Sequence, residues 1–249
     1  MTRLLILEDA QRLAAGMASD LREELGLDVT VSNKIRELPA LLSKQHFDLA
    51  LVDLSFPVEK PRSGADALMY LHLTSPDTRL AIVTQGDEWV ARLLQDVWDA
   101  LPIETVLSKT QLNHVTAVQV MLRGERFPID SAIRLTLAAE RDPARALPQY
   151  RQLFEGHAGY KRLWRALIRC PEPVLPRSVA DLFALDGGTG VGPSAVNSYR
   201  QDSIRTLEKL KFPAGARLEE MGQIAKRVRP FLLWAMDEWD ELASETPLL

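Results

Sequence analysis

The sequence predicts an α/β protein, in which a five-stranded, doubly wound parallel sheet is followed by a mainly α-helical second domain. Two observations predict this fold class. Short apolar runs, typical of buried parallel strands, alternate with longer amphipathic stretches through the first half of the chain. After Gly124 the alternation stops, and apolar residues then recur at helical spacing.

Five strand–helix units account for the first half of the chain. The apolar runs predict strands at residues 4–7, 28–32, 49–52, 80–83 and 106–107. The stretches between and after them predict helices at residues 11–25, 35–44, 64–73, 89–99 and 111–123. Such alternation is typical of a parallel sheet with helices on both faces.

Polar residues end four of these strands. They are the acidic pair Glu8 and Asp9, then Asp53, Thr84 and Lys109. Because the carboxyl ends of parallel strands share one edge of the sheet, we expect these side chains to converge there. Carboxylate oxygens suit Mg²⁺, and a carboxylate can attack a phosphoryl group to form an acyl phosphate. A hydroxyl and an ammonium group can then hold the phosphate oxygens.

In order and spacing these residues resemble the receiver domain of two-component response regulators, over roughly residues 1–125. The resemblance implies that Asp53 accepts a phosphoryl group from a sensor histidine kinase. It also implies that Mg²⁺ is held by Glu8, Asp9 and Asp53 together with the backbone carbonyl of Ser55.

By the same resemblance, Thr84 and Lys109 bind the new phosphate. Three neighbouring positions depart from the family pattern. Gln85 stands where a small residue usually follows the hydroxyl, so it is expected to crowd access to the site. Val106 replaces the frequent aromatic residue three positions before the lysine, and Thr110 replaces the frequent proline after it. The metal and acceptor groups are intact, so the chemistry is expected, but a readout through an aromatic ring is not.

Composition narrows the class of protein further. The 249 residues suggest one or two domains, and 46% are hydrophobic, enough to build real cores. No run of 18 apolar residues is present, and the first residues indicate a strand rather than a signal peptide. The single Cys170 excludes an intramolecular disulfide and is interpreted as a buried, small apolar residue. We therefore expect a cytoplasmic protein with no membrane partner.

The charge distribution divides the chain. Residues 1–125 carry 12 basic and 18 acidic side chains, whereas residues 151–229 carry 14 basic and 8 acidic ones. A basic second segment fits a polyanion-binding domain, although ordinary surface variation also produces such a difference. We expect a receiver domain at 1–125, a helical connection at 126–158 and a helical output domain at 159–249.

The predicted output domain contains helices at residues 160–170, 177–185 and 193–210. Residues 163–183, 195–199 and 207–210 resemble the winged-helix output domain of transcriptional response regulators. Where that family has a β-hairpin wing, this chain has Pro213, Ala214 and Gly215 and then a helical pattern. A helix-turn-helix is therefore the more general expectation.

The helix at 193–210 has a polar face of the residue types that reach bases and phosphates in the major groove. Its candidate DNA-binding residues are Ser194, Asn197, Ser198, Arg200, Gln201 and Arg205. A solvated polar face is the alternative interpretation. Residues 217–243 form a further apolar stripe that Pro230 is expected to kink or divide. The stripe is either core of the output domain or a dimer-forming helix.

The sequence thus predicts a response regulator that is phosphorylated on Asp53 and regulates transcription by binding DNA, as a homodimer. We expect Mg²⁺ as its cofactor and no enzymatic activity beyond self-catalysed phosphoryl transfer and dephosphorylation. Two alternatives stay open. One is a receiver joined to a helical protein-interaction module that does not bind DNA, and the other is a receiver that acts without phosphorylation.

Overall fold

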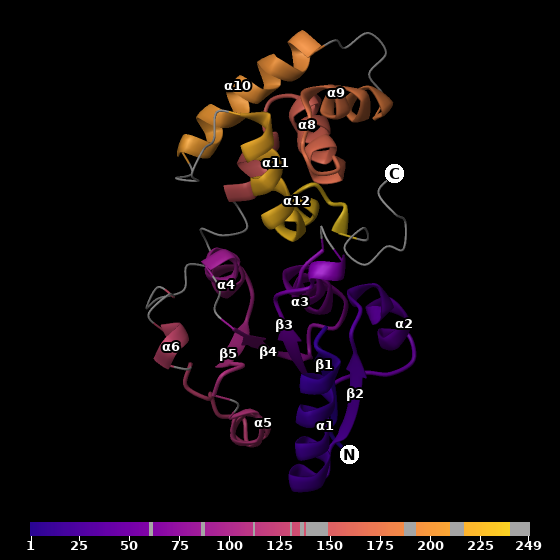
Figure 1. Ribbon diagram of the computed structural model, residues 1–249, viewed down its shortest axis with the longest axis vertical. Helices are drawn as coiled ribbons and strands as arrows, with labels where there is room; N and C mark the ends of the chain where they lie inside the picture. The colour runs from indigo at the N-terminus through magenta and orange to yellow at the C-terminus, as the bar shows by residue number, and fades with distance from the viewer. Residues whose placement is uncertain are drawn as a thin grey trace. The chain divides into compact units, whose positions relative to one another are not determined.

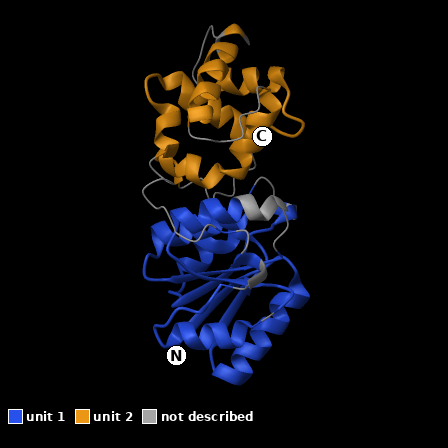
Figure 2. Ribbon diagram, turned by 90° about the vertical axis from the view of Figure 1, so that its left-hand side faces the viewer, with its two compact units in different colours: residues 1–143, 240–244 blue, residues 144–239, 245–249 orange. Residues whose placement is uncertain are grey.

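The computed structural model describes residues 1–59, 62–85, 88–111, 113–129, 131–134, 137, 149–186, 193–209 and 217–239. The chain forms two compact units, shown in different colours in Figure 2. Unit 1 lies within residues 1–143 and unit 2 within residues 144–239.

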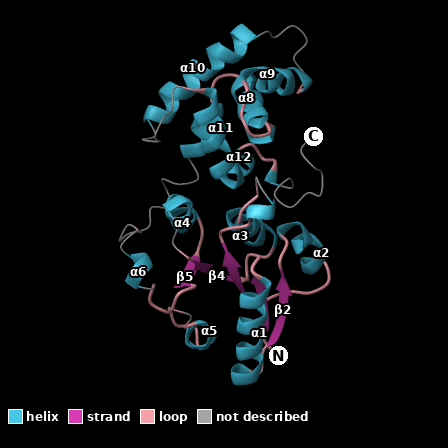
Figure 3. Ribbon diagram, in the orientation of Figure 1, coloured by secondary structure: helices cyan, strands magenta, loops and turns pink. Residues whose placement is uncertain are grey.

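Unit 1 is built on a five-stranded sheet in which all neighbouring strands run parallel. The strands are β1 (Arg3–Leu7), β2 (Asp28–Ser32), β3 (Leu49–Asp53), β4 (Arg79–Thr84) and β5 (Ile103–Ser108). Their order is β2-β1-β3-β4-β5 (the strands are magenta in Figure 3 and all five are labelled in Figure 1), which is that of the flavodoxin-like doubly wound fold. The predicted five-stranded, doubly wound parallel sheet is therefore confirmed, and the order of strands reverses between β1 and β3.

Helices cover both faces of this sheet (Figure 1). Helices α1 (Gln11–Leu25) and α5 (His114–Leu122) pack on one face through a shared apolar core that includes Met17, Leu21 and Met121. Helices α2 (Leu38–Leu42), α3 (Gly64–Thr74) and α4 (Glu88–Ala100) lie on the other face. The short helix α6 (Ser131–Arg134) follows later in the chain.

Two predicted helices of unit 1 have different bounds in the structure. The helix expected at 35–44 is divided into a 3₁₀ turn, η1 (Ile35–Glu37), and α2, which carries Pro39 in its first turn. Proline lacks an N–H and disfavours helical geometry in the residue before it, so it starts a helix more readily than it continues one. The helix expected from residue 111 begins at His114, because Gln111 N–H donates to Ser108 O in a turn.

The secondary structure elements of unit 2 are all helical among its described residues, in line with the predicted mainly α-helical second domain. It contains η3 (Gln152–Phe154), α8 (Ala158–Arg169), α9 (Pro176–Leu185), α10 (Pro193–Lys209), α11 (Leu218–Arg227) and α12 (Arg229–Ala235). Large buried side chains from several of these helices form its core, among them Trp164, Phe183 and Phe231. The predicted interruption near Pro230 is confirmed, since α11 ends just before Val228 and α12 carries Pro230 in its first turn.

Some predictions lie outside the described residues. These are much of the helical connection expected at 126–158, the end of the helix expected at 193–210, the residues 213–215 that stand in place of a wing, and the stripe beyond residue 239. Within the described parts of the chain, no helix is both long enough and apolar enough to cross a membrane.

Candidate functional site

The register of the sheet brings the predicted acids side by side. Leu7 pairs with Val52, so the residues that follow them, Glu8 and Asp53, lie next to each other at the carboxyl edge. Both residues are buried, each with 1% of its surface exposed. The negative charge of a buried carboxylate is costly unless a cation or hydrogen-bond donor offsets it, so the partners of Glu8 and Asp53 determine the chemistry of the site.

Lys109 supplies that compensation for both acids. Its Nζ lies 2.8 Å from Glu8 Oε1 and 2.9 Å from Asp53 Oδ2. The Lys109 side chain is itself only 8% exposed, and its backbone N–H donates to Thr84 O at 2.9 Å. One ammonium group from the end of β5 therefore bridges the ends of β1 and β3.

Burial governs the acid–base properties of this cluster. Burial raises the pKa of Glu8 from its ordinary value of 4.5 to about 7, although the hydrogen bond from Lys109 acts to lower it. Burial likewise raises the pKa of Asp53, again against the effect of Lys109. Burial acts to lower the pKa of Lys109, but its bonds to the two acids outweigh burial and leave that pKa raised. The single cation thus only partly offsets two buried carboxyl groups.

The three predicted metal-binding acids do come together. One carboxylate oxygen from each of Glu8, Asp9 and Asp53 lies within 4.8 Å of the other two. Glu8 Oε2 is buried and has no hydrogen-bond partner among the described residues. Mg²⁺ prefers oxygen ligands and commonly binds one or two carboxylates while it keeps several waters. The three carboxylates, one with a buried oxygen that lacks a partner, therefore fit this ion. Ser55, whose carbonyl is the predicted fourth ligand, is partly buried two residues beyond Asp53.

Gly64, which the sequence analysis did not single out, packs against the backbone of Asp53. A β-carbon at Gly64 would collide with the carbonyl group of Asp53 and with Leu54 Cα. Gly64 N–H also donates to Leu54 O at 3.1 Å. The start of α3 is fixed by a capping box, in which Asp66 Oδ2 accepts from the backbone N–H of Ser63 at 2.8 Å. The Ser-x-x-Asp spacing was a readable signal for this helix start.

Thr84, the remaining predicted phosphate-site residue, lies at the same edge, and two of the positions that depart from the family pattern, Gln85 and Val106, are also described. Thr84 ends β4 fully buried and pairs with Ser108, the residue before Lys109. Val106 is fully buried within β5. Gln85 is exposed, so its backbone position next to Thr84 does not carry the side chain into the protein core.

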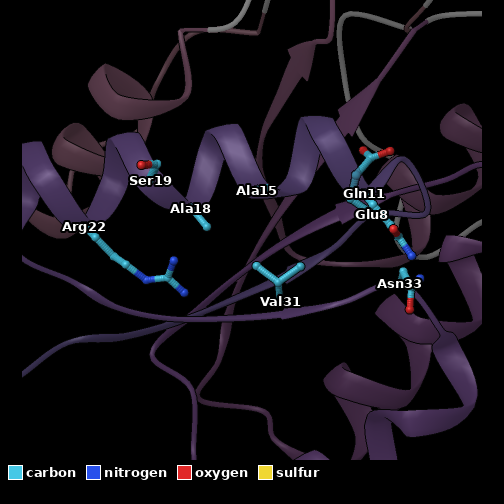
Figure 4. A pocket seen from close by; sticks show the side chains of 8 residues that line it. All are labelled: Glu8, Gln11, Ala15, Ala18, Ser19, Arg22, Val31 and Asn33. Atoms are coloured by element: carbon cyan, nitrogen blue, oxygen red, sulfur yellow. The ribbon is translucent and has the colours of Figure 1, made fainter.

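A groove of about 390 Å³ runs between α1 and β2 (Figure 4). Its lining includes Ala15, Ala18 and Val31 along the middle, with Arg22 at one end and Glu8 at the other. The Arg22 guanidinium is engaged with Val29 O at 2.5 Å. The groove is therefore an opening beside the acid pair, and its only cation is held by the protein backbone.

In unit 2, helix α10 buries its apolar face and exposes its polar face, as the residue types on each face suggest. Val196, Ser203 and Leu207 are buried. The candidate DNA-binding residues are on the outside: Ser194, Asn197, Ser198, Gln201 and Arg205 are exposed, and Arg200 is partly exposed. A polar surface of this kind is available to a ligand.

Contacts within unit 2 engage three of these side chains, those of Asn197, Arg200 and Arg205. Arg200 Nε donates to Asn197 Oδ1 at 3.0 Å. Arg205 Nη1 lies 3.3 Å from Asp202 Oδ1, and Tyr160 OH donates to Asp202 Oδ2 at 3.2 Å. Asp202, an unfavourable neighbour for phosphate, is therefore paired through both of its oxygens.

The apolar stripe of α11 and α12 packs inside unit 2. Met221, Ala225 and Leu232 are buried, and the Phe231 ring stacks on Tyr150 at 5.3 Å between centroids. Trp234 is covered by the Arg151 guanidinium at 4.5 Å. These contacts favour the core interpretation of the stripe over that of a dimer-forming helix. Cys170 is buried, as predicted.

No known protein-family model and no curated protein matches the chain. Solved structures with a similar fold include the isolated receiver domain of RcsB from Salmonella enterica serovar Typhimurium with the phosphomimetic BeF₃⁻. It is 18% identical, with a TM-score of 0.47, and the match covers 55% of this chain and 99% of that one.

Two further similar structures cover different extents of the chain. RcsB from the same organism, bound to the promoter rprA in the presence of BeF₃⁻, is 16% identical with a TM-score of 0.45, and the match covers 93% of this chain and 98% of that one. The response regulator TrrA from Thermotoga maritima, in complex with Mg²⁺ and BeF, is 16% identical with a TM-score of 0.40, covering 49% and 98%. Identities and TM-scores of this size say nothing of what this chain binds or does.

Proposed function

We propose that the protein is a response regulator whose unit 1 is a receiver phosphorylated on Asp53. The observation that carries the proposal is the bridge from Lys109 to both Glu8 and Asp53 at the carboxyl edge of the sheet. It joins a buried acceptor carboxylate, a charge-neutralising cation and a group of three acids suited to Mg²⁺. Together these groups suit phosphoryl transfer to a carboxylate, since one accepts the group and the others offset its charge.

Each residue has a role in this chemistry. A carboxylate oxygen of Asp53 attacks the phosphorus as the donor's leaving group departs, which produces an acyl phosphate. Lys109 then offsets the added negative charge, and the hydroxyl of Thr84 donates to a phosphate oxygen. Glu8 and Asp9 would hold Mg²⁺ with Asp53 and the carbonyl of Ser55. Bound there, Mg²⁺ supplies positive charge that lowers repulsion between the acids and the incoming phosphoryl group.

The proposed donor is a sensor histidine kinase, and the proposed site of action is the cytoplasm. The proposed output is regulation of transcription by unit 2, which binds DNA through α10 as a homodimer. The exposed polar face of α10 and the basic balance of residues 151–229 support DNA as the partner. The pairing of Asp202 with Arg205 and Tyr160 reduces the repulsion this acid would exert on phosphates.

A binding assay on fragmented genomic DNA, with and without a small-molecule phosphodonor and Mg²⁺, tests the complete proposal. Phosphorylated protein should retain a subset of fragments, and binding should weaken steeply as salt rises because bound cations displace counterions from the phosphates. The Asp53→Asn variant should show no response to the donor. Absence of binding at low salt in either state would contradict the DNA-binding output.

A second candidate output is a helical protein-interaction module. The observation in its favour is that the described residues of unit 2 include six helical segments and no strand, so they show no β-hairpin wing. If the protein becomes phosphorylated on Asp53 but binds no DNA fragment, the result would favour this output and would agree with the proposed receiver.

A further inference from the structure

Glu59 lies six residues beyond Asp53, and its side chain bonds to another loop, the one that follows β2. It ends the short 3₁₀ helix η2 (Pro57–Glu59) within residues 54–59, here called the acceptor segment. Glu59 Oε2 accepts a hydrogen bond from the backbone N–H of Ile35 at 2.8 Å and lies 3.4 Å from the N–H of Arg36. Oε1 lies 3.8 Å from Arg36 Nε. The acceptor segment is thereby joined to the loop that follows β2.

This contact is well shielded and connects segments far apart in the chain. The Glu59 side chain is only 10% exposed, and Ile35 is fully buried. The bonded residues are 24 positions apart in sequence. A charged acceptor on a buried backbone N–H makes one of the stronger hydrogen bonds in proteins, and losing it leaves that N–H without a partner.

The acceptor segment is held at two further points. At its start, Leu54 follows Asp53, is fully buried, and accepts the N–H of Gly64 at 3.1 Å. Within it, the N–H of Glu59 donates to Phe56 O at 3.0 Å, and Phe56 is buried. These bonds tie the segment to itself and to α3. The Glu59 carboxylate ties it to the loop that follows β2.

We propose that Glu59 is a positioning residue for phosphorylation, which acts by fixing the acceptor segment and with it the backbone at Ser55. The inference rests on the proposed function, because Ser55 matters only if the acceptor site binds metal and is phosphorylated. A displacement of this backbone by about 1 Å is enough to slow a reaction severely, since the reacting groups must be held in near-attack geometry.

The test compares three variants of the full chain. Glu59→Ala removes the acceptor, whereas Glu59→Gln keeps a carbonyl oxygen for the Ile35 N–H and loses only the charge. Glu37→Ala is the matched control, because Glu37 belongs to the neighbouring η1 but pairs with Ser32 at 2.8 Å and Lys34 at 3.3 Å. Each variant is assayed for its phosphorylation rate by acetyl phosphate over a series of Mg²⁺ concentrations.

Glu59→Ala should slow phosphorylation roughly tenfold, the size expected for one hydrogen bond to a charged group, and should need more Mg²⁺ for half-maximal rate. Glu59→Gln should recover most of the rate, and Glu37→Ala should match the wild type. Amide hydrogen exchange gives a readout that needs no phosphorylation. In Glu59→Ala it should accelerate at Ile35 and across residues 54–59, with the sheet still protected.

The outcomes separate the two proposals. If wild type and Glu59→Ala are phosphorylated at equal rates with equal Mg²⁺ dependence, the role of Glu59 is overturned and the proposed function still stands. Faster exchange in Glu59→Ala without any change in rate would likewise reduce Glu59 to a structural contact. A wild-type protein that takes up no phosphoryl group would overturn the proposed function, and the role of Glu59 with it.

Discussion

The ammonium group of Lys109 lies 2.9 Å from Oδ2 of Asp53 and is shared with Glu8. Because all three side chains are buried, this pair is a structural element as well as a reactive one. Removing one partner of a buried ion pair leaves an uncompensated charge, which destabilises proteins by about 3–5 kcal/mol. The bridge therefore couples stability of unit 1 to the chemistry of its site.

Lys109→Met should accordingly lower the free energy of unfolding by about 3 kcal/mol at neutral pH in the absence of Mg²⁺. Urea denaturation measures this change. Lys34→Met is the control, because Lys34 pairs with Glu37 at the surface, where both side chains are more than 40% exposed. Such surface pairs contribute about 1 kcal/mol or less. Equal losses in the two variants would contradict the proposed structural role of the bridge.

The raised pKa of Glu8, about 7, predicts how stability varies with pH. A carboxyl group with a higher pKa in the folded state binds more protons there than in the unfolded state between pH 4.5 and about 7. Without Mg²⁺, its contribution to stability is therefore present at low pH and is lost as pH rises through about 7. The raised pKa of Asp53 acts in the same direction.

Glu8→Gln should flatten this pH dependence, because an amide does not titrate. Urea denaturation at a series of pH values between 5 and 8 measures it, with Glu23→Gln on the exposed surface of α1 as the control. Mg²⁺ binding requires the deprotonated acid, so its affinity should increase across the same range. A Mg²⁺ affinity independent of pH from 6 to 8 would contradict the predicted role of Glu8.

Gly64→Ala should disturb the acceptor directly, because its β-carbon would collide with the backbone of Asp53. We expect a loss of stability of about 1–3 kcal/mol, typical of overpacking, and a slower phosphorylation rate. Gly16→Ala is the control, since its β-carbon would meet nothing within 4 Å and alanine favours helix by about 1 kcal/mol. The midpoint temperature of thermal unfolding should therefore fall for Gly64→Ala and rise for Gly16→Ala.

The sequence predicted the sheet and the convergence of Glu8, Asp53, Thr84 and Lys109 because each of these residues stands at the end of an apolar run, Lys109 after one intervening serine. Parallel register then places strand ends together without further information. Gly64 was not recognised, because a glycine in a segment rich in loop residues is equally typical of a simple turn. Its close approach to Asp53 depends on tertiary packing.

Pairing between distant residues was also beyond the reach of the sequence. Neither spacing nor residue type indicates that Glu59 bonds to Ile35, or that Asp202 is shared by Tyr160 and Arg205. The helix bounds at residues 35–44 were inaccurate because the helical spacing of apolar residues continues across Pro39, where the structure instead begins a new helix.

Arg205 offers a test of the DNA-binding surface. If it makes a bidentate base contact, Arg205→Ala should cost about 1–3 kcal/mol of binding free energy. Asp202→Asn should instead strengthen binding, since it removes a negative charge beside the phosphates and releases Arg205. Fluorescence anisotropy on a retained DNA fragment measures both, with the exposed Arg123 of unit 1 changed to alanine as the control. Unchanged affinity in both variants would exclude α10 as the contact surface.

Phosphorylation of Asp53 is the central claim, and intact-protein mass spectrometry tests it most directly. With Mg²⁺ and acetyl phosphate, the wild-type protein should gain one phosphoryl group, while Asp53→Asn should gain none and retain the same cooperative unfolding transition. Equal labelling of wild type and Asp53→Asn, or no labelling of either, would contradict the account.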